Sequence, residues 1–253
     1  MSREPLPAGV TYDRGFRLPG TPLGFQGTVN PGLLFFANID QRPPRTEQRI
    51  LSTPTAAAAV GAIGRGLDTM GLAYERKVRL GKMDIRLLPS GFGPGGALLE
   101  VAYKDRVIVF CDGIRLARPL HSTPAIVPTC DLLLVDTACA EPRPPSPRTV
   151  AKELAAWAKR GLEGGVPVVT CGSPAAAVDV AWALKDLEAP MTAARPIYEM
   201  LSRLETSGYD FPLLRRLNQE WPGQGLVLHW SHLWTYSRFF KEADAVAFAG
   251  QGR

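Results

Sequence analysis

Residues 91–96 (GFGPGG) have the residue types of a loop that wraps a phosphate group. Such a loop offers backbone amides at a helix N-terminus, and its nucleotide-binding form continues into a Lys-Ser or Lys-Thr pair. Here Pro94 removes one amide, no such pair follows, and the apolar run after Gly96 predicts a strand. The segment therefore predicts a tight turn and not a nucleotide site.

Histidines and cysteines do not form a familiar metal or nucleophile motif. The three histidines are His121, His229 and His232, and the last two lack the acidic residue and the spacing of a zincin motif. Because Trp230 and Trp234 flank them, we expect these two histidines to pack and not to bind metal. No CxxC pair is present, so we expect buried thiols in a reducing compartment. The cysteines are Cys111, Cys130, Cys139 and Cys171.

Positive charge is concentrated in the first part of the chain. The net charge is +5, and residues 1–150 hold the whole excess, because the remainder contains equal numbers of basic and acidic residues. A basic cluster could contact nucleic-acid phosphates weakly and without sequence preference, or could simply be a solvated face. Its residues are Arg76, Lys77, Arg79, Lys82 and Arg86.

The elements that must position these groups change character along the chain. Residues 1–35 are rich in Gly and Pro, which favours turns and hairpins. The alanine-rich run 55–67 contains no proline and predicts a helix capped by Ser52 or Thr53. The strands expected before residue 140 are 32–36, 82–88, 97–103, 106–111 and 131–136.

Residues 141–148 contain four prolines, which exclude a helix or a central strand, so this segment is the expected domain boundary. Beyond it, helices and strands alternate, which predicts a parallel α/β unit. The helices expected there are 149–162, 174–187 and 196–205, and the strands are 166–171, 190–193, 225–229 and 245–249.

Composition predicts a folded chain outside the membrane. Apolar residues make up 45% and charged residues 21%, which is typical of globular proteins. No plausible helix reaches the roughly 20 apolar residues of a membrane span. The N-terminus (MSREPLP) carries charge and proline where a signal peptide has an apolar core. We therefore expect a soluble, cytoplasmic protein with no membrane partner.

Taken together, several segments resemble the metallo-β-lactamase fold, and more closely its β-CASP nuclease branch. That branch includes the DNA exonucleases associated with bacterial ligases and the RNA 3′-end processing nucleases. The likeness lies in the order and spacing of short motifs over nearly the whole chain. The motifs are residues 33–41, 51–57, 91–97, 110–112, 130–138, 164–170 and 196–198.

The resemblance implies a fold of the α/β class. Residues 1–145 would form a metallo-β-lactamase-like αββα sandwich, and residues 146–224 a β-CASP-like α/β unit. Residues 225–253 would supply return strands to the sandwich core. The family would use two zinc ions, held by imidazole and carboxylate ligands, to activate a bridging water.

This chain departs from the family at the metal positions. The positions where the family has histidine ligands are Phe36, Asn38, Gln41, Phe92 and Ala249. Phenylalanine cannot bind a metal, so we expect no resident metal and no cofactor. The carboxylates that remain are Asp40, Asp112 and Asp136. They could bind Mg²⁺ or Ca²⁺ weakly, or accept hydrogen bonds at strand ends without a metal.

Three hypotheses follow. The first is a catalytically inactive, nuclease-like pseudoenzyme that serves as a binding or scaffold subunit in nucleic-acid processing or repair. The second is a metal-dependent hydrolase or nuclease with a rebuilt site around Asp40, Asp112 and Asp136, and the third is a non-specific nucleic-acid-binding module. An aromatic cluster, formed by Trp230, Trp234 and Tyr236, is the candidate interface for a protein partner or a second copy. Core packing is the alternative for these aromatic residues.

Overall fold

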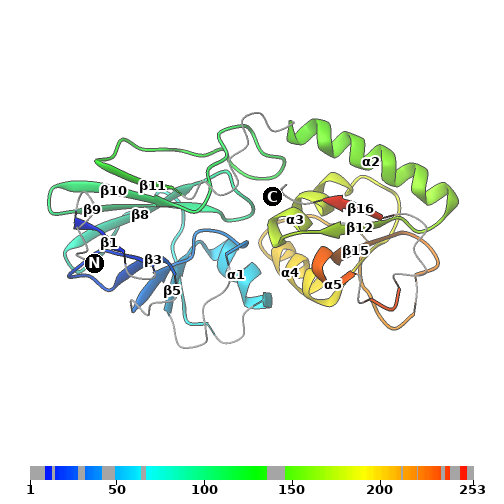
Figure 1. Cartoon of the computed structure of the whole chain (residues 1–253), viewed down its shortest axis with the longest axis horizontal. Helices are drawn as coiled ribbons and strands as arrows, with labels where there is room; N and C mark the ends of the chain where they lie inside the picture. Colours follow the sequence, from blue (N-terminus) through cyan, green and yellow to red (C-terminus); the bar gives the residue numbers. More distant parts are fainter. Residues whose placement is uncertain are drawn as a thin grey trace. The chain divides into compact units, whose positions relative to one another are not determined.

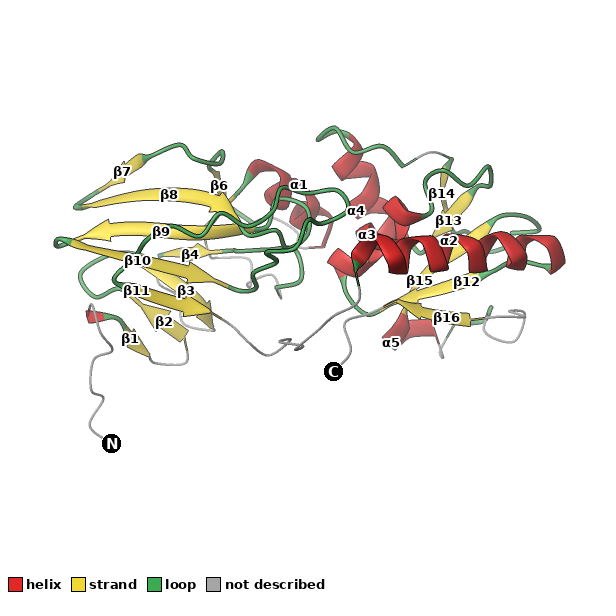
Figure 2. Ribbon diagram, turned by 90° about the horizontal axis from the view of Figure 1, so that it is seen from above, coloured by secondary structure: helices red, strands yellow, loops and turns green. Residues whose placement is uncertain are grey.

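The protein has two compact units, residues Met1–Ala138 and Cys139–Arg253, as seen in the computed structural model (Figures 1 and 2). Both contain β-sheet and helix, so the predicted α/β class is confirmed. The boundary lies just before the proline-rich segment. The structure describes residues 9–12, 15–27, 32–41, 49–63, 67–135, 146–211, 213–220, 222–234, 237–239 and 246–249.

The N-terminal unit contains two sheets. The first is antiparallel from β1 to β3 and parallel from β3 to β6, and α1 (Pro54–Ile63) connects its last two strands. Its strands, in spatial order, are β1 (Thr11–Tyr12), β2 (Gly15–Arg17), β3 (Leu23–Gly27), β4 (Leu33–Phe35), β5 (Arg49–Ser52) and β6 (Thr69–Gly71). The second sheet is an antiparallel meander with one parallel edge strand. It consists of β7 (Val78–Leu80), β8 (Met83–Pro89), β9 (Ala97–Tyr103), β10 (Arg106–Cys111) and β11 (Leu132–Val135).

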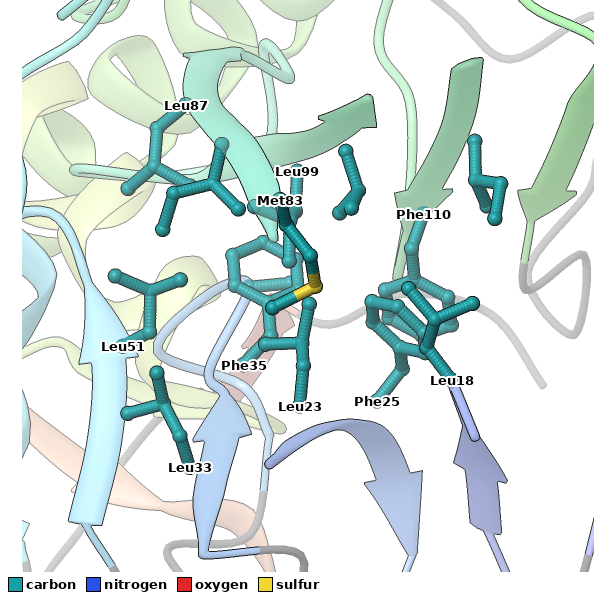
Figure 3. Packing of buried hydrophobic residues seen from close by; sticks show 14 of the residues in the cluster. Leu18, Leu23, Phe25, Leu33, Phe35, Leu51, Met83, Leu87, Leu99 and Phe110 are labelled. Carbon is teal, nitrogen blue, oxygen red and sulfur yellow. The ribbon is translucent and has the colours of Figure 1, made fainter. Parts of the chain in front are cut away.

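The two sheets share one hydrophobic core. In β8, alternate residues Met83, Ile85 and Leu87 are buried, because side chains on a strand point to opposite faces in turn. Phe110 of β10 stacks on Phe25 of the first sheet, with ring centroids 4.9 Å apart. In Figure 3, Met83, Leu87 and Phe110 of the second sheet and Leu23, Phe25 and Phe35 of the first sheet point toward one another. This packing holds β4 of the first sheet against β10 of the second.

The C-terminal unit is a parallel sheet with helical connections, as the sequence predicts. The spatial order of the strands is β14-β13-β15-β12-β16, and every pair is parallel. Proline in the first turn starts α2, α3 and α4, where the missing amide costs nothing. The elements are α2 (Pro147–Gly164), β12 (Val168–Cys171), α3 (Pro174–Ala183), β13 (Met191–Ala193), α4 (Arg195–Glu205), β14 (Leu214–Arg216), β15 (Leu226–Trp230), α5 (Ser231–Trp234) and β16 (Val246–Ala249).

The expectation that residues 225–253 return to the N-terminal core is wrong. Strand β15 lies between β13 and β12, and β16 pairs with the other side of β12. The physical reason is that β15 is apolar on both faces, as a strand in the middle of a parallel sheet must be. Both strands therefore belong to the C-terminal unit.

Two further findings refine the expectations. Within the described residues of the N-terminal unit, α1 is the one helix, whereas an αββα sandwich has helices on both outer faces. No helix in the described part of the chain is long and apolar enough to cross a membrane.

Candidate functional site

The ends of β4 and β10 bring two predicted site residues together. Asn38 follows β4 and Asp112 follows β10, 74 residues later in the chain. The Asn38 side-chain amide donates to the Asp112 carboxylate at 3.2 Å and to the Asp112 backbone carbonyl at 3.1 Å. Phe35 and Phe110, which pack edge to face at 5.9 Å, hold these two strands against each other. The sequence therefore places the pair correctly at strand ends, and the core sets its geometry.

The remaining polar atoms of this site also have partners. The side-chain oxygen of Asn38 accepts from the backbone amides of Asp40 and Gln41 at 2.8 and 3.2 Å. The side-chain oxygen of Gln41 accepts from the Ala37 amide at 2.9 Å. Asn38 is only 2% exposed, so these bonds satisfy groups that are shielded from water. Asn38 thus acts as a structural amide that fixes the loop after β4.

Two of the predicted metal positions hold phenylalanine, and the structure shows how each is used. Phe36 is buried, with 1% of its surface exposed. Phe92 is partly exposed, and the guanidinium of Arg115 lies over its ring at 5.6 Å, within reach of a cation–π interaction. Sequence reasoning missed Arg115, because a single arginine three residues after a strand-end aspartate carries no recognisable motif.

The glycine segment is a tight turn between β8 and β9, as predicted. The Ser90 amide donates to the Gly96 carbonyl at 3.0 Å, and Gly91, Gly93 and Gly95 have φ near +70°. A Cβ on Gly95 would lie 2.5 Å from the Ala56 amide nitrogen in the first turn of α1. The segment therefore packs its own backbone against that helix.

The residues of this region do not fit the two-zinc site that the resembled family would have. Phe36 and Phe92 offer no ligand atom, and the amide of Asn38 is already committed to Asp112. Within the described ranges, no group of three or more His, Cys, Asp or Glu side chains could hold a metal ion. Asp136 lies outside those ranges, and Ala249 is on β16 in the C-terminal unit.

Two cysteines in these sheets are buried thiols with a raised pKa. Burial raises the pKa of Cys111 to about 12, and its thiol donates to the Gly113 carbonyl at 2.7 Å. Burial alone raises the pKa of Cys171 to about 12. Both are free of disulfides, which confirms the prediction of buried thiols for these two. Cys130 is half-buried, and Cys139 lies outside the described residues.

Two members of the basic cluster are paired with carboxylates. Arg86 forms two hydrogen bonds to Glu100 on β9, and Arg79 contacts both carboxylate oxygens of Asp84 at 3.0 Å. The bond to Glu100 raises the pKa of Arg86. Arg76, Lys77 and Lys82 are exposed, and Arg79 is exposed as well although it is ion-paired. Ion pairing therefore reduces what the cluster can offer to a phosphate.

Only part of the aromatic cluster lies within the described residues. Trp230 is 7% exposed and lies at the end of β15, so its expected role as a partly exposed interface residue is wrong. It is a core residue because β15 is central in its sheet. Trp234 ends α5, and Tyr236 lies outside the described residues. His229 is half-buried, and its ring nitrogen lies 3.2 Å from the Trp230 carbonyl oxygen.

Comparisons with known proteins bear on the fold alone. A solved structure from Enterococcus faecalis V583, described as a protein of unknown function, is similar to this chain with a TM-score of 0.57 and 10% sequence identity. The match covers 86% of this chain and 69% of that chain, so it includes parts of both units. No family model and no curated protein matches this sequence.

Proposed function

We propose that this protein is a catalytically inactive member of the metallo-β-lactamase fold, of the β-CASP nuclease type, that acts as a binding or scaffold subunit. The observation that carries the proposal is the hydrogen bond from the Asn38 amide to the Asp112 carboxylate. In this arrangement a neutral donor satisfies a carboxylate at a position where the resembled nucleases hold a cation. The region is then stable without an ion.

The neighbouring side chains support the same proposal. Phe36 is buried in the apolar interior, and Phe92 lies beneath the Arg115 guanidinium. Replacing Phe36 by histidine would place an imidazole in surroundings packed for an apolar ring. The chain has therefore exchanged ligand chemistry for packing at these positions, which favours a role in binding.

The exposed basic residues also support the proposal of a nuclease-like binding subunit. Arg76, Lys77 and Lys82 are exposed near the β7–β8 hairpin, where they can reach a phosphate backbone. This observation favours a second candidate function, weak and non-specific nucleic-acid binding, which is compatible with the first.

The experiment that tests the proposal combines thermal stability with hydrolysis. We expect EDTA or added zinc to leave the melting temperature unchanged, because a metal that binds only the folded state would raise it. We also expect no hydrolysis of single-stranded or double-stranded DNA or RNA above that of the Asp112→Ala variant. Hydrolysis that requires a divalent metal and is lost in Asp112→Ala would instead establish the rebuilt carboxylate site.

A further inference from the structure

The second sheet of the N-terminal unit ends in an apolar edge strand. Strands β7 and β11 are its two edges (Figure 2). An edge strand can pair with a strand of another chain, and proteins commonly discourage this with charged residues or proline on the edge. Strand β7 carries the exposed Arg79, and β14, an edge of the C-terminal sheet, carries the exposed Arg215 and Arg216. The sequence of β11, Leu-Leu-Leu-Val, contains neither charge nor proline.

The outer side of β11 presents the backbone groups of two residues. On β10, the Val107 amide donates to the Asp131 carboxylate at 2.7 Å and the Val107 carbonyl accepts from the Asp131 amide at 2.8 Å, so the backbone of Val107 faces β11. Alternate residues of a strand direct their backbone groups to the same side, so Val109 and Cys111 face β11 as well. In a parallel pair, the residues in register with these two turn their own amides and carbonyls away. They are Leu133 and Val135.

The side chains of β11 are apolar and partly accessible on both faces of the sheet. Leu132 and Leu134 pack on the core that the two sheets share and are only partly buried there. Leu133 lies on the opposite face, because successive side chains alternate, and it is 40% exposed. The nearest charge before the strand is Asp131, which is ion-paired with Arg106 of the same chain at 3.3 Å. A strand laid along this edge would therefore cover apolar side chains on both faces and would bury no charge of β11.

We propose that β11 pairs with β11 of a second copy of this chain, in antiparallel orientation about a two-fold axis. A register centred on Leu134 would place Leu133 of each copy opposite Val135 of the other, which makes four hydrogen bonds between the outward backbone groups. Leu134 would face its own equivalent across the axis. In the same register Asp131 and Asp136 would face threonine and leucine positions, so no two carboxylates would oppose each other.

A second copy is favoured as the occupant because the edge is complementary to itself. Every cross-strand pair among residues 133–135 is apolar in this register, and apolar pairs of this kind stabilise neighbouring strands. Two-fold dimers are also the commonest assemblies of soluble chains. The pairing would join two five-stranded sheets into one continuous sheet. This inference goes beyond the proposed function, since it requires neither the Asn38–Asp112 bond nor a nucleic acid.

The test measures the mass of the full chain by gel filtration with light scattering over a wide range of protein concentrations. We expect the mass to rise from that of one chain to that of two and then to stay constant. Leu133→Pro removes the outward amide, and with it two of the four hydrogen bonds, without removing a donor to β10. It should weaken dimerisation by at least about tenfold. Leu133→Lys, which places a charge on the edge, should weaken it as well.

A second measurement tests the register. In a chain with Cys130 and Cys139 replaced by serine, Leu134→Cys should form a disulfide-linked dimer under mild oxidation. Leu132→Cys should not, because position 134 alone faces itself across the axis, and a disulfide needs two Cα atoms within about 7 Å.

Val150→Lys is the matched control, because Val150 is 45% exposed on α2 in the other unit and the substitution should leave the mass unchanged. Circular dichroism verifies that each variant is folded. The inference is overturned if the wild type keeps the mass of one chain at every concentration, or if both Leu133 variants dimerise as well as the control. It is also overturned if the mass grows beyond two chains, or if Leu132→Cys cross-links as readily as Leu134→Cys. Each of these results leaves the metal-free account standing, whereas a resident zinc would overturn that account without changing the mass.

Discussion

The two units treat the polar groups at their strand ends differently. In the N-terminal unit, the Asp112 carboxylate at the end of β10 receives a hydrogen bond from Asn38. In the C-terminal unit, burial at the ends of β12 and β15 lowers the pKa of His229 and raises that of Cys171, so both side chains are held in their uncharged forms. Because burial also raises the pKa of Cys111 at the end of β10, the contrast lies between Asp112, whose carboxylate is paired, and His229, whose ring is kept neutral. Neither arrangement depends on a bound ion, so each can be broken by changing the protein alone.

The largest effect is expected where the core supports the Asn38–Asp112 pair. Phe110 is 2% exposed and contacts the rings of Phe25 and Phe35. Phe110→Ala should therefore lower the free energy of unfolding by about 3–5 kcal/mol, measured by urea denaturation. Leu133→Ala is the control on the same sheet, and because Leu133 is 40% exposed its cost should be about 1 kcal/mol or less. Equal losses for the two variants would contradict the described core.

The second-largest loss of stability is expected when the Asn38–Asp112 hydrogen bond is removed. Asn38→Ala should cost about 1–3 kcal/mol, because it removes the side-chain hydrogen bonds that Asn38, only 2% exposed, makes with the Asp112 carboxylate and the amides of Asp40 and Gln41. In a double-mutant cycle with Asp112→Ala, the double variant should lose less stability than the sum of the losses in the two single variants. The coupling energy should be at least about 0.5 kcal/mol. Strict additivity would mean that the hydrogen bond contributes nothing.

A smaller effect on stability is expected from pH, and it tests whether His229 in the C-terminal unit is kept uncharged. Burial is the main cause that lowers the pKa of His229, and nearby His232 lowers it further. As the pH falls through about 6.5, the unfolded chain takes up a proton at this histidine before the folded chain does, so stability is lost. The fall in unfolding free energy between pH 7.5 and 5 should be shallower in His229→Gln. Identical pH profiles would show that His229 is not held neutral.

The smallest effect on folding is expected at the exposed basic residues. Reversing Arg76, Lys77 and Lys82 to glutamate should leave the melting temperature nearly unchanged and should abolish any low-salt binding to DNA or RNA. The matched control is Arg79→Gln, since Arg79 is already paired with Asp84. Unaltered nucleic-acid binding in the triple variant would identify the cluster as a solvated face.

Much of the fold could be predicted because the signals are local. Two apolar runs joined by a two-residue turn, 104–105, predict β9 and β10 to the residue, and alternating helices and strands predict the parallel sheet. Strand β5 was not predicted, because its four residues lie next to the alanine-rich helix and show little pattern of their own. The assignment of residues 225–253 failed because pairing partners are chosen by tertiary packing, which the sequence of one strand does not encode.

The residues of the site could be predicted from the sequence, but the contacts between them could not. The sequence identifies Asn38 and Asp112 as strand-end residues, but their hydrogen bond depends on how two sheets pack across 74 residues of chain. The connection between β10 and β11 has no periodic pattern, because Pro119, Pro124 and Pro128 interrupt it. Its course along the sheet could not be predicted from the sequence.

The central claim is that the Asn38–Asp112 region is complete without a metal ion. Elemental analysis of the full chain, purified without chelators, tests this claim most directly. The account predicts zinc, manganese and iron at far less than one atom per chain, with no uptake after incubation with zinc and gel filtration. One or two zinc ions per chain that are lost in the Asp112→Ala variant would contradict it.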